Sequence, residues 1–379
     1  MAIRILHLAD IHLGAVHQFL PPEKQARRTG EILESFKEIL SEAVDGAPHV
    51  NAIMISGDLF DSPDPTSELI GRVKRLSDRL KEKNIPILVV PGNHDNIIAP
   101  DSVFNKVEFP GIVVLNSPSI AEPKELVLGD TLFHFYGMTY TFMSKQPFDT
   151  FRPRKSDVRN IAIIHGALKN NPEWKLHAQD IPLRAENLLN TGFDYIALGH
   201  YHNFLHVQRN GTHVVYPGSL EPLGWTEEGK RQVVIAEFED GDVRINSAPF
   251  AGQRRYFKTF ELNCDLHSFE STEDIARYVM ERFADSKIFF RLILKGQLDF
   301  MPDITQLAET CADHFYYFRC EDSTTITAPE KIRSLSNENT IRGLAVSKLI
   351  SLIENAPTEQ EKNTAREALK ILMGHFSND

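Results

Sequence analysis

Five short apolar runs in this chain each lead into side chains that can bind a metal ion. The runs and their endings are Ile3–Ala9 before Asp10 and His12, Ala52–Ser56 before Asp58, Ile87–Val90 before Asn93-His94, Ile161–Ile164 before His165, and Tyr195–Leu198 before His200 and His202. Runs of this length that are rich in β-branched residues are typical of buried strands. Ligand sites in open α/β sheets gather beyond the carboxyl ends of the strands. The pattern therefore predicts that strands bring these side chains together in one site.

The segments between these runs predict a layered α/β fold. Residues Glu31–Val44 and Glu68–Lys83 carry apolar side chains at the helical period. Later in the chain, Gln232–Phe238 and Val243–Ile245 predict a hairpin whose turn is Asp240-Gly241. Helices after the early strands and a hairpin after the later ones favour a sheet-based α/β sandwich over a purely doubly wound sheet.

The pattern changes around Pro249–Gly252. The following segment predicts a small α+β unit with strands at Arg255–Leu262, Phe289–Leu294 and Phe315–Arg319 and helices at Thr272–Ala284 and Asp303–Ala312. Two amphipathic helices, Thr340–Glu354 and Glu359–Phe376, are expected after it, separated by Pro357. We therefore predict three parts, at residues 1–250, 251–325 and 326–379.

Composition favours a globular protein of the cytoplasm. The first strand starts almost at Met1, which leaves no room for a signal peptide, and no apolar stretch reaches the roughly 20 residues that span a bilayer. The cysteines, Cys264, Cys311 and Cys320, are odd in number and match neither a disulfide framework nor a zinc motif. We expect a reducing compartment and no membrane association.

The net charge of −11 argues against a protein that coats nucleic acid through bulk positive charge. Local basic clusters remain candidates for DNA contacts: Arg72/Lys74/Arg75/Arg79 with Lys81 and Lys83, Arg152/Arg154/Lys155/Arg159, and Arg254-Arg255 with Lys258. Acidic residues are interspersed among them, which favours a solvated surface. The DNA-binding residues therefore stay unknown at this stage.

The side chains at the strand ends are suited to two divalent ions. Two carboxylates, one amide and four imidazoles match the preferences of Mn²⁺, Fe²⁺ or Zn²⁺. They are Asp10, His12, Asp58, Asn93, His165, His200 and His202. A carboxylate is the natural bridge between neighbouring cations, and Asp58 lies between the other ligands in chain order. Two such ions stabilise charged oxygens and acidify a bridging water, which fits hydrolysis of a phosphate ester.

The motifs around these residues resemble, in the same order, those of the calcineurin-like metallophosphoesterases. They read Asp10-x-His12, Gly57-Asp58-x-x-Asp61, Gly92-Asn93-His94-Asp95, His165-Gly166 and Gly199-His200-x-His202. Within that superfamily, His12-Leu13-Gly14, Gly57–Asp61 and Val214–Glu221 are similar to the SbcD family, the nuclease subunits of double-strand-break repair complexes. The resemblance covers residues 1 to about 221 by motif and the remainder only in outline.

The resemblance implies a fold and a set of residue roles. The fold would be a calcineurin-like sandwich of two mixed sheets flanked by helices, followed by a small α+β capping domain and a C-terminal helical tail. One ion would be held by Asp10, His12, Asp58 and His202, and the other by Asp58, Asn93, His165 and His200. His94 would be the general acid at the leaving oxygen, and Asp61 would orient its imidazole. His7 and His17 are expected to lie outside the metal set.

The resemblance further implies a Mn²⁺-dependent DNA nuclease, a 3'-5' exonuclease and also an endonuclease, that acts as a homodimer. The C-terminal helices would dock on an SbcC-like coiled-coil ATPase, since the chain has no Walker A loop of its own. Packing of these helices on the protein's own core is an equal alternative. Two other functions stay open: a metallophosphoesterase for small phosphodiesters or phosphomonoesters, and a scaffold that recruits the ATPase.

Overall fold

The computed structural model of the protein describes residues 2–46, 49–117, 122–138, 152–153, 158–169, 181–326 and 329–376. The chain forms two compact units, Met1–Arg255 and Tyr256–Asp379, each of which is considered by itself. We call them unit 1 and unit 2. Unit 2 contains both the predicted α+β unit and the tail, and the finer division at residues 250 and 325 stays a prediction.

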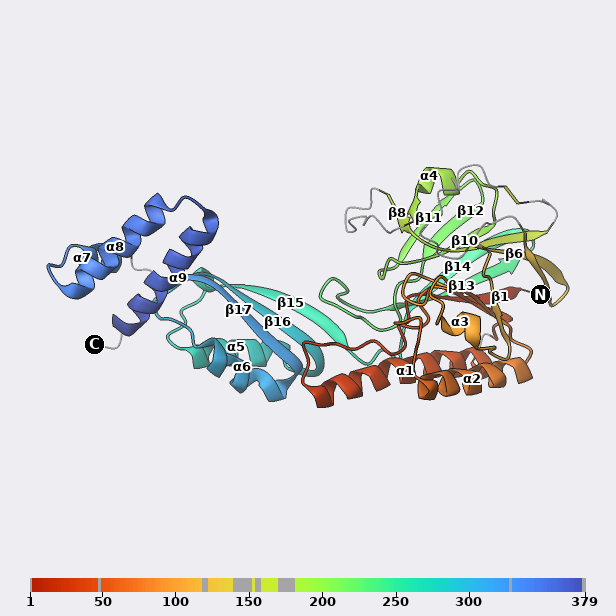
Figure 1. Ribbon diagram of the computed structural model, residues 1–379, viewed down its shortest axis with the longest axis horizontal. Coiled ribbons are helices and arrows are strands. Elements are labelled where there is room, and N and C mark those ends of the chain that lie inside the picture. The colour runs from red at the N-terminus through yellow and green to blue at the C-terminus, as the bar shows by residue number, and fades with distance from the viewer. Residues whose placement is uncertain are drawn as a thin grey trace. The chain divides into compact units, whose positions relative to one another are not determined.

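Unit 1 is built on two six-stranded mixed sheets (Figure 1). The first sheet has the order β14-β13-β1-β2-β3-β4 and the second the order β11-β12-β10-β7-β6-β5. The strands of the first sheet are β1 (Ile3–Leu8), β2 (Ala52–Ser56), β3 (Ile87–Val90), β4 (Ile112–Val114), β13 (Gln232–Glu239) and β14 (Asp242–Pro249). Those of the second are β5 (Lys124–Leu128), β6 (Thr131–Met138), β7 (Arg159–His165), β10 (Tyr195–Gly199), β11 (Leu205–Arg209) and β12 (Thr212–Tyr216). The predicted sandwich of two mixed sheets is thus confirmed.

Helices and short elements cover the outer faces of the sheets. They are α1 (Pro22–Asp45), α2 (Ser67–Glu82), α3 (Val103–Lys106), α4 (Ala185–Leu188), β8 (Ala167–Leu168) and β9 (Pro182–Leu183). The alternation of side chains along each strand separates two cores. In β1, Ile5 belongs to the core between the sheets, whereas Leu6 packs with Ile32 and Phe36 of α1. Helices α1 and α2 lie side by side along this face (Figure 1).

Helix α1 begins well before the predicted start at Glu31. Pro22 occupies the first turn, where its fixed φ and missing N–H carry no cost. The first turns carry few apolar side chains, and the first buried side chain of the helix is that of Arg28. Arg28 is fully buried, and its Nη1 donates to Glu221 Oε2 at 2.7 Å. This buried ion pair lets a charged residue occupy a core position of the helix.

The predicted hairpin of β13 and β14 is confirmed. Its two-residue turn, Asp240-Gly241, has φ of 47° and 95°. Turns with both central residues at positive φ match the twist of the flanking strands. The hairpin extends the first sheet beyond β1, with Ile5 opposite Ala236 in the antiparallel pair.

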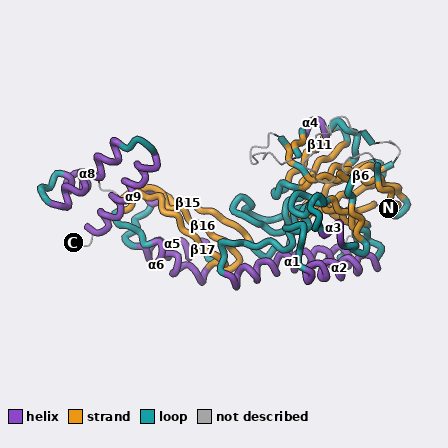
Figure 2. The backbone as a smooth tube through the Cα atoms, viewed as in Figure 1, coloured by secondary structure: helices purple, strands orange, loops and turns teal. Residues whose placement is uncertain are grey.

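Unit 2 opens with a parallel three-stranded sheet, ordered β15-β16-β17 (Figure 2). Its elements are β15 (Tyr256–Asn263), α5 (Thr272–Phe283), β16 (Asp285–Leu298), α6 (Ile304–Cys311) and β17 (Phe315–Ile326), with single turns of 3-10 helix at Cys264–Leu266 and Ala312–His314. The elements match the predicted ones in type and order. Strands β16 and β17 are longer than expected: β16 extends beyond both predicted ends, and β17 continues through the mostly polar residues after Arg319 to Ile326.

Three helices follow: α7 (Pro329–Ser336), α8 (Ile341–Asn355) and α9 (Glu359–Phe376). The sequence analysis missed α7 and expected an amphipathic α8. The helices share a small core of Leu335, Val346 and Met373. Yet Ile341 and Leu344 on α8 are 90% and 71% exposed. Helix α8 is therefore apolar on both its packed and its exposed faces. None of the helices described for the chain has both the length and the apolar content to span a membrane.

Candidate metal centre

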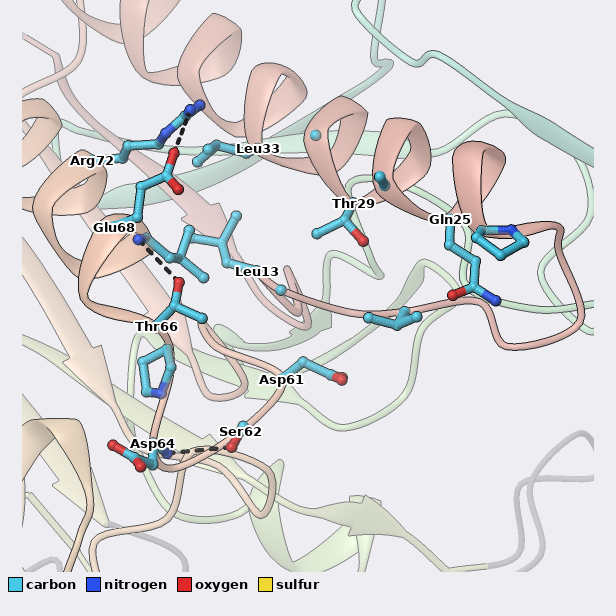
Figure 3. Close-up of a pocket in the computed structure, with 17 residues that line it drawn as sticks. Leu13, Gln25, Thr29, Leu33, Asp61, Ser62, Asp64, Thr66, Glu68 and Arg72 are labelled. Atoms are coloured by element: carbon cyan, nitrogen blue, oxygen red, sulfur yellow. Dashed lines mark hydrogen bonds and ion pairs between the residues drawn. The ribbon is translucent and has the colours of Figure 1, made fainter.

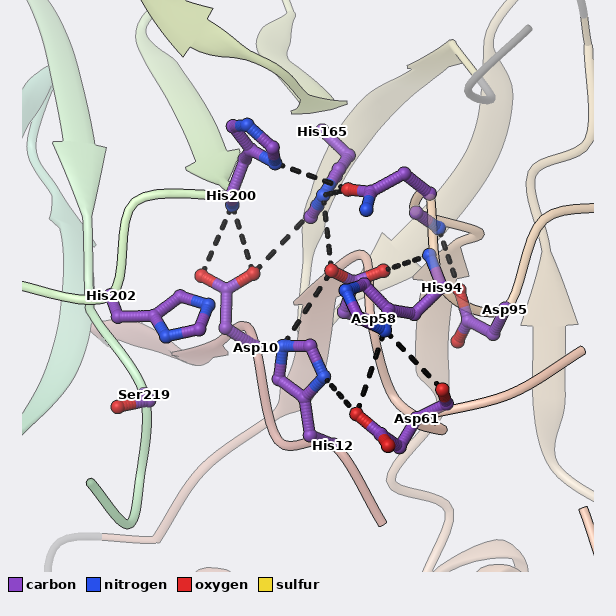
Figure 4. Close-up of polar contacts among 12 residues, drawn as sticks. Asp10, His12, Asp58, Asp61, His94, Asp95, His165, His200, His202 and Ser219 are labelled. Atoms are coloured by element: carbon purple, nitrogen blue, oxygen red, sulfur yellow. Dashed lines mark hydrogen bonds and ion pairs between the residues drawn. The ribbon is translucent and has the colours of Figure 1, made fainter. Parts of the chain in front are cut away.

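The predicted ligands come together beyond the carboxyl ends of strands from both sheets of unit 1 (Figure 4). Strands β1, β2 and β3 of the first sheet lead into Asp10 and His12, Asp58, and Asn93 and His94 respectively. Strands β7 and β10 of the second sheet lead into His165, and into His200 and His202. All nine residues named by the sequence analysis, with Asp61 as the ninth, belong to this one crevice.

The Asp58 carboxylate occupies the centre of the site. Its Oδ2 atom lies 3.6 Å from His12 Nε2 and 3.3 Å from His165 Nε2. Its Oδ1 atom accepts a hydrogen bond from the backbone N–H of His94 at 2.9 Å. A carboxylate placed between two imidazole groups in this way is able to bridge two ions.

The other ligands divide into two groups around Asp58. On one side, ligand atoms of Asp10, His12 and His202 all lie within 4.8 Å of one another. On the other side, Asn93 Oδ1 lies 2.8 Å from His165 Nε2 and 3.1 Å from His200 Nδ1. Asp10 also reaches toward the second group, with its Oδ1 3.8 Å from His165 Nδ1. Asp10, Asp58 and His165 also form a group whose ligand atoms lie within 4.8 Å of one another, so the division of the ligands between two ions stays a prediction.

His94 lies at the rim of the crevice with 44% of its side chain exposed. Its Nδ1 is 3.3 Å from the Asp61 backbone oxygen and 3.5 Å from Asp61 Oδ1. The same carboxylate oxygen is closer to His12 Nδ1, at 2.9 Å. Asp61 therefore contacts both the proposed acid and a proposed ligand, and its stronger hydrogen bond goes to His12.

The backbone is strained where it presents the ligands. Asp10, His12, Asp58 and His200 have positive φ, which is uncommon for residues other than glycine and concentrates at functional sites. Hydrogen bonds hold the strained loops together, because the N–H groups of Ile11 and His12 both donate to the Asp58 carbonyl at 2.9 Å. The hydrogen bonds between the loop after β1 and the loop after β2 thus maintain the positive φ angles of the ligands.

Glycines permit the close approach of these loops. A Cβ atom on Gly57 would lie 2.1 Å from His165 Nδ1, and one on Gly92 would lie 2.2 Å from Asp58 Oδ1. A Cβ on Gly199 would lie 1.8 Å from the Ser56 carbonyl. These three glycines of the motifs are therefore required by the geometry of the site.

The buried carboxylates of the crevice are stabilised by positive charge on neighbouring groups. Burial by itself would raise the pKa of Asp58, but the His165 and His12 imidazoles lower it far below its usual range. Burial would lower the pKa of His165, yet Asp58 raises it to about 9. The buried carboxylates thus draw protons onto neighbouring imidazoles. Divalent cations would supply this charge directly, and the oxygen and nitrogen donors fit borderline ions, so these residues fit a two-ion centre.

Two carboxylates near the site were given no role by the sequence analysis. Asp95 is fully buried and accepts from Gly92 N at 2.7 Å and Phe60 N at 3.1 Å, which ties two ligand loops together. Its position beside His94 in the motif was the available signal. Glu227 contacts His202 Nδ1 at 2.9 Å, and no spacing rule connects these two residues.

The histidines expected to lie outside the ligand set are engaged elsewhere. His7 is fully buried inside β1, with Nδ1 2.8 Å from the Tyr195 hydroxyl and Nε2 2.6 Å from Ser56 Oγ. His17 is buried beside Phe19, at 5.8 Å between ring centroids. Neither residue belongs to a group that could hold a metal ion among the residues that the structure describes.

A hollow of about 660 Å³ opens beside the site, next to Asp61 (Figure 3). Leu13, Leu33 and Leu69 give it apolar walls, and Thr29 and Asp64 are among its polar lining residues. Of the nine residues of the metal centre, Asp61 alone lines this hollow.

The predicted basic clusters are partly used within the protein. Arg254 contacts Glu38, and Arg255 contacts Glu31, both acids on α1. Arg72 pairs with Glu68 at 2.8 Å. Arg154 and Lys155 lie outside the described residues. These pairs favour a structural or solvated role for the basic side chains that take part in them.

Residues 3–204 match the model of the calcineurin-like phosphoesterase family. The chain is 27% identical over 249 residues to the uncharacterized metallophosphoesterase YhaO of Bacillus subtilis (strain 168), covering 64% of this chain and 59% of that protein. It is 28% identical over 254 residues to the DNA double-strand break repair protein Mre11 of Saccharolobus solfataricus, and the match covers 62% of this chain and 60% of that protein. The Mre11 protein of Sulfurisphaera tokodaii is 24% identical over 380 residues, covering 94% and 90%.

The first two of these matches span only about three fifths of each relative. The family match, over residues 3–204, includes every residue of the metal centre from Asp10 to His202. Because the match to residues 3–204 takes in more than half of the chain, the chain belongs to the calcineurin-like phosphoesterases.

Proposed function

We propose that the protein is a dimetal-dependent DNA nuclease that hydrolyses phosphodiester bonds in double-strand-break repair, as a 3'-5' exonuclease and as an endonuclease. The observation that carries this proposal is the similarity to the Mre11 protein of Sulfurisphaera tokodaii, which extends over 94% of the chain and so continues past the metal centre into unit 2. A small-molecule phosphoesterase needs no such second unit. We further propose Mn²⁺ as the ion at both positions.

The residues of the crevice divide the chemistry between them. Two bound ions would neutralise the phosphate and acidify the attacking water. Asp58 would hold both ions, since its Oδ2 faces His12 and His165 at 3.6 and 3.3 Å. His94, exposed at the rim, would donate a proton to the leaving oxygen. The hollow beside Asp61 would take the part of the DNA attached to that oxygen.

Helix α8 supports a proposal about the partner. Ile341, Leu344 and Leu352 lie on one side of the helix by their spacing, and they are 90%, 71% and 52% exposed. An apolar stripe of this kind fits the groove or surface of another helical protein. We propose that it binds the coiled coil of an SbcC-like ATPase. The homodimer implied by the family resemblance is part of the same proposal.

The test is hydrolysis of end-labelled duplex and single-stranded DNA with Mn²⁺, with bis-p-nitrophenyl phosphate as a small substrate. The wild-type protein is compared with His94→Gln and with His49→Gln, a control at an exposed histidine. We expect His94→Gln to lower DNA hydrolysis about 10²- to 10⁴-fold, the usual contribution of a positioned proton donor, while Mn²⁺ affinity stays unchanged. His49→Gln should behave as the wild type.

Two results would contradict the proposal. Hydrolysis of the small diester with intact DNA would identify a small-molecule phosphoesterase. Loss of Mn²⁺ by His94→Gln would show that His94 is a ligand and not a proton donor.

A further inference from the structure

His202 is held at two points of its structure by the segment that follows β12. Its ring Nδ1 lies 2.9 Å from Glu227 Oε1. Its backbone carbonyl accepts from the Ser219 N–H at 2.9 Å and from Arg231 Nη1 at 3.0 Å. Both the ring and the backbone of this one residue are therefore positioned from the same part of the chain.

Glu227 is buried and fully engaged. Only 5% of the residue is exposed. Its second oxygen, Oε2, accepts from Ser219 Oγ at 2.7 Å and from the Leu223 N–H at 3.2 Å, and lies 3.7 Å from Arg231 Nη1. A buried carboxylate is tolerated when its oxygens are hydrogen-bonded and a cation is near. The surroundings of Glu227 meet both conditions, so the carboxylate has a fixed orientation toward His202.

The turn at residues 217–219 allows this arrangement. Gly218 has a φ of +79°, and a Cβ atom there would lie 2.4 Å from the His202 carbonyl oxygen. The turn thus packs directly on the backbone of His202. Ser219, fully buried, then contacts both His202 and Glu227.

We propose that Glu227 is the positioning residue for His202 as a metal ligand. A carboxylate can only accept, so His202 donates its Nδ1–H to Glu227 and keeps the lone pair of Nε2 for an ion. The ligand atoms of His202, Asp10 and His12 lie within 4.8 Å of one another, where that ion would bind. Carboxylate partners of this kind fix the ring and increase its basicity. This inference rests on the proposed two-ion function.

The proposed effect is confined to one of the two ions. His165, in the other ligand group, has its Nδ1 2.9 Å from the neutral carbonyl of Ser56. Glu227 has no contact with His165 or Asn93 among the interactions described for it. Loss of Glu227 should therefore weaken the ion at Asp10, His12 and His202 and spare the ion at Asn93, His165 and His200.

Glu221 offers a matched control in the same segment. It is 2% exposed, and like Glu227 it accepts from a serine hydroxyl, Ser35 Oγ at 2.7 Å, and from a backbone N–H, that of Arg254 at 2.6 Å. It also pairs with a buried arginine, Arg28. The two glutamates differ in that Glu227 contacts a metal-site histidine and Glu221 contacts α1. Glu221→Gln should reduce stability without changing metal affinity.

The experiment is a calorimetric titration of the metal-free full-length protein with Mn²⁺, alongside thermal unfolding and electron paramagnetic resonance of bound Mn²⁺. We expect two ions in the wild type. In Glu227→Gln one dissociation constant should rise about 10- to 100-fold, the usual effect of removing such a partner, and the other should stay unchanged. In Glu221→Gln both constants should match the wild type, although unfolding occurs at a lower temperature.

Several outcomes would overturn the inference. Wild-type affinities in Glu227→Gln would do so, and so would an equal loss at both ions in the two glutamate variants, which would indicate a structural role. If Glu227→Gln does not fold, Ser219→Ala takes its place: a smaller rise in the same single constant supports the inference, and no rise overturns it. A wild type that binds fewer than two ions would instead remove the proposed two-ion function itself.

Discussion

The crevice of unit 1 and helix α8 of unit 2 depart from the usual distribution of side chains in opposite directions. In the crevice, charged groups are buried: Asp10 is 0% and Asp58 1% exposed. On α8, apolar groups are exposed: Ile341 is 90% and Leu344 71% exposed. Each departure costs free energy in the isolated chain, because buried charge loses hydration and exposed apolar surface orders water.

The two regions therefore need different kinds of ligand. A small crevice of carboxylates and imidazoles is balanced by compact positive charge, which divalent ions provide. Exposed apolar side chains along a helix are stabilised when another apolar surface covers them, and the partner proposed above would supply that surface. The comparison predicts that the first region responds to metal chelation and the second to the presence of a protein partner.

The largest expected effect comes from Asp58→Asn. Because Asp58 Oδ2 lies between the two ligand groups, its loss should weaken both ions, each by more than about 100-fold, since even outer partners of ligands contribute about 10- to 100-fold. Phosphodiester hydrolysis should fall to background. Mn²⁺ titration measures the effect, with Asp78→Asn, an exposed position on α2, as the control. One ion still bound at wild-type affinity would show that Asp58 is not a bridge.

His7 provides a contrast to the charged groups of the crevice. It is a buried polar side chain whose ring nitrogens contact protein hydroxyls, so it needs no metal ion. Burial lowers its pKa to about 3, from a usual value near 6.5. Below pH 6.5 the unfolded chain binds a proton at His7 that the folded protein does not. As the pH is lowered from 6.5 to 3, the free energy of unfolding should therefore decrease. This group contributes about 1.4 kcal/mol for each pH unit.

The variant His7→Gln isolates this contribution. In metal-free protein at pH 7 it should be less stable than the wild type, since it loses the hydrogen bonds to Tyr195 and Ser56. The difference should narrow as the pH falls toward 4, because Gln does not titrate. Denaturant unfolding at a series of pH values measures both curves. Parallel curves would show that His7 does not govern the pH dependence.

The smallest effect on stability is expected on α8. The double variant Ile341→Gln, Leu344→Gln should change the free energy of unfolding by no more than about 0.5 kcal/mol, because both side chains are exposed. It should nevertheless lose the proposed binding to the coiled-coil segment of an SbcC-like ATPase. Val346→Ala, at a fully buried position of the same helix, should instead destabilise unit 2 by about 0.5–3 kcal/mol. Full partner binding by the double variant would mean that the stripe is not the docking surface.

Much of the metal centre could be predicted from the sequence, because strand order and motif order carry the same information. Each ligand lies at the end of its strand or a few residues after it, and parallel strands place their carboxyl ends at one edge. The partner of a ligand is a different matter. Glu227 reaches His202 only through the fold of the turn at Gly218, so the contact has no period or spacing that could reveal it.

The helices show the same limit. The predicted helix started at Glu31, where the apolar period begins, whereas α1 starts at Pro22 and buries Arg28 through its tertiary pair with Glu221. In α8 the opposite occurs. Its apolar residues were expected to share one face, whereas the helix uses Val346 inside and leaves Leu344 outside.

The absence of a side chain at Gly57, Gly92 and Gly199 changes how related sequences should be sorted. Each of these positions is a place where one loop rests on another with no space for a methyl group. A homologue that retains all seven ligand letters but carries alanine at Gly57 would place a carbon where the His165 ring belongs. Selecting active enzymes by their ligands alone would therefore accept sequences in which the crevice cannot close.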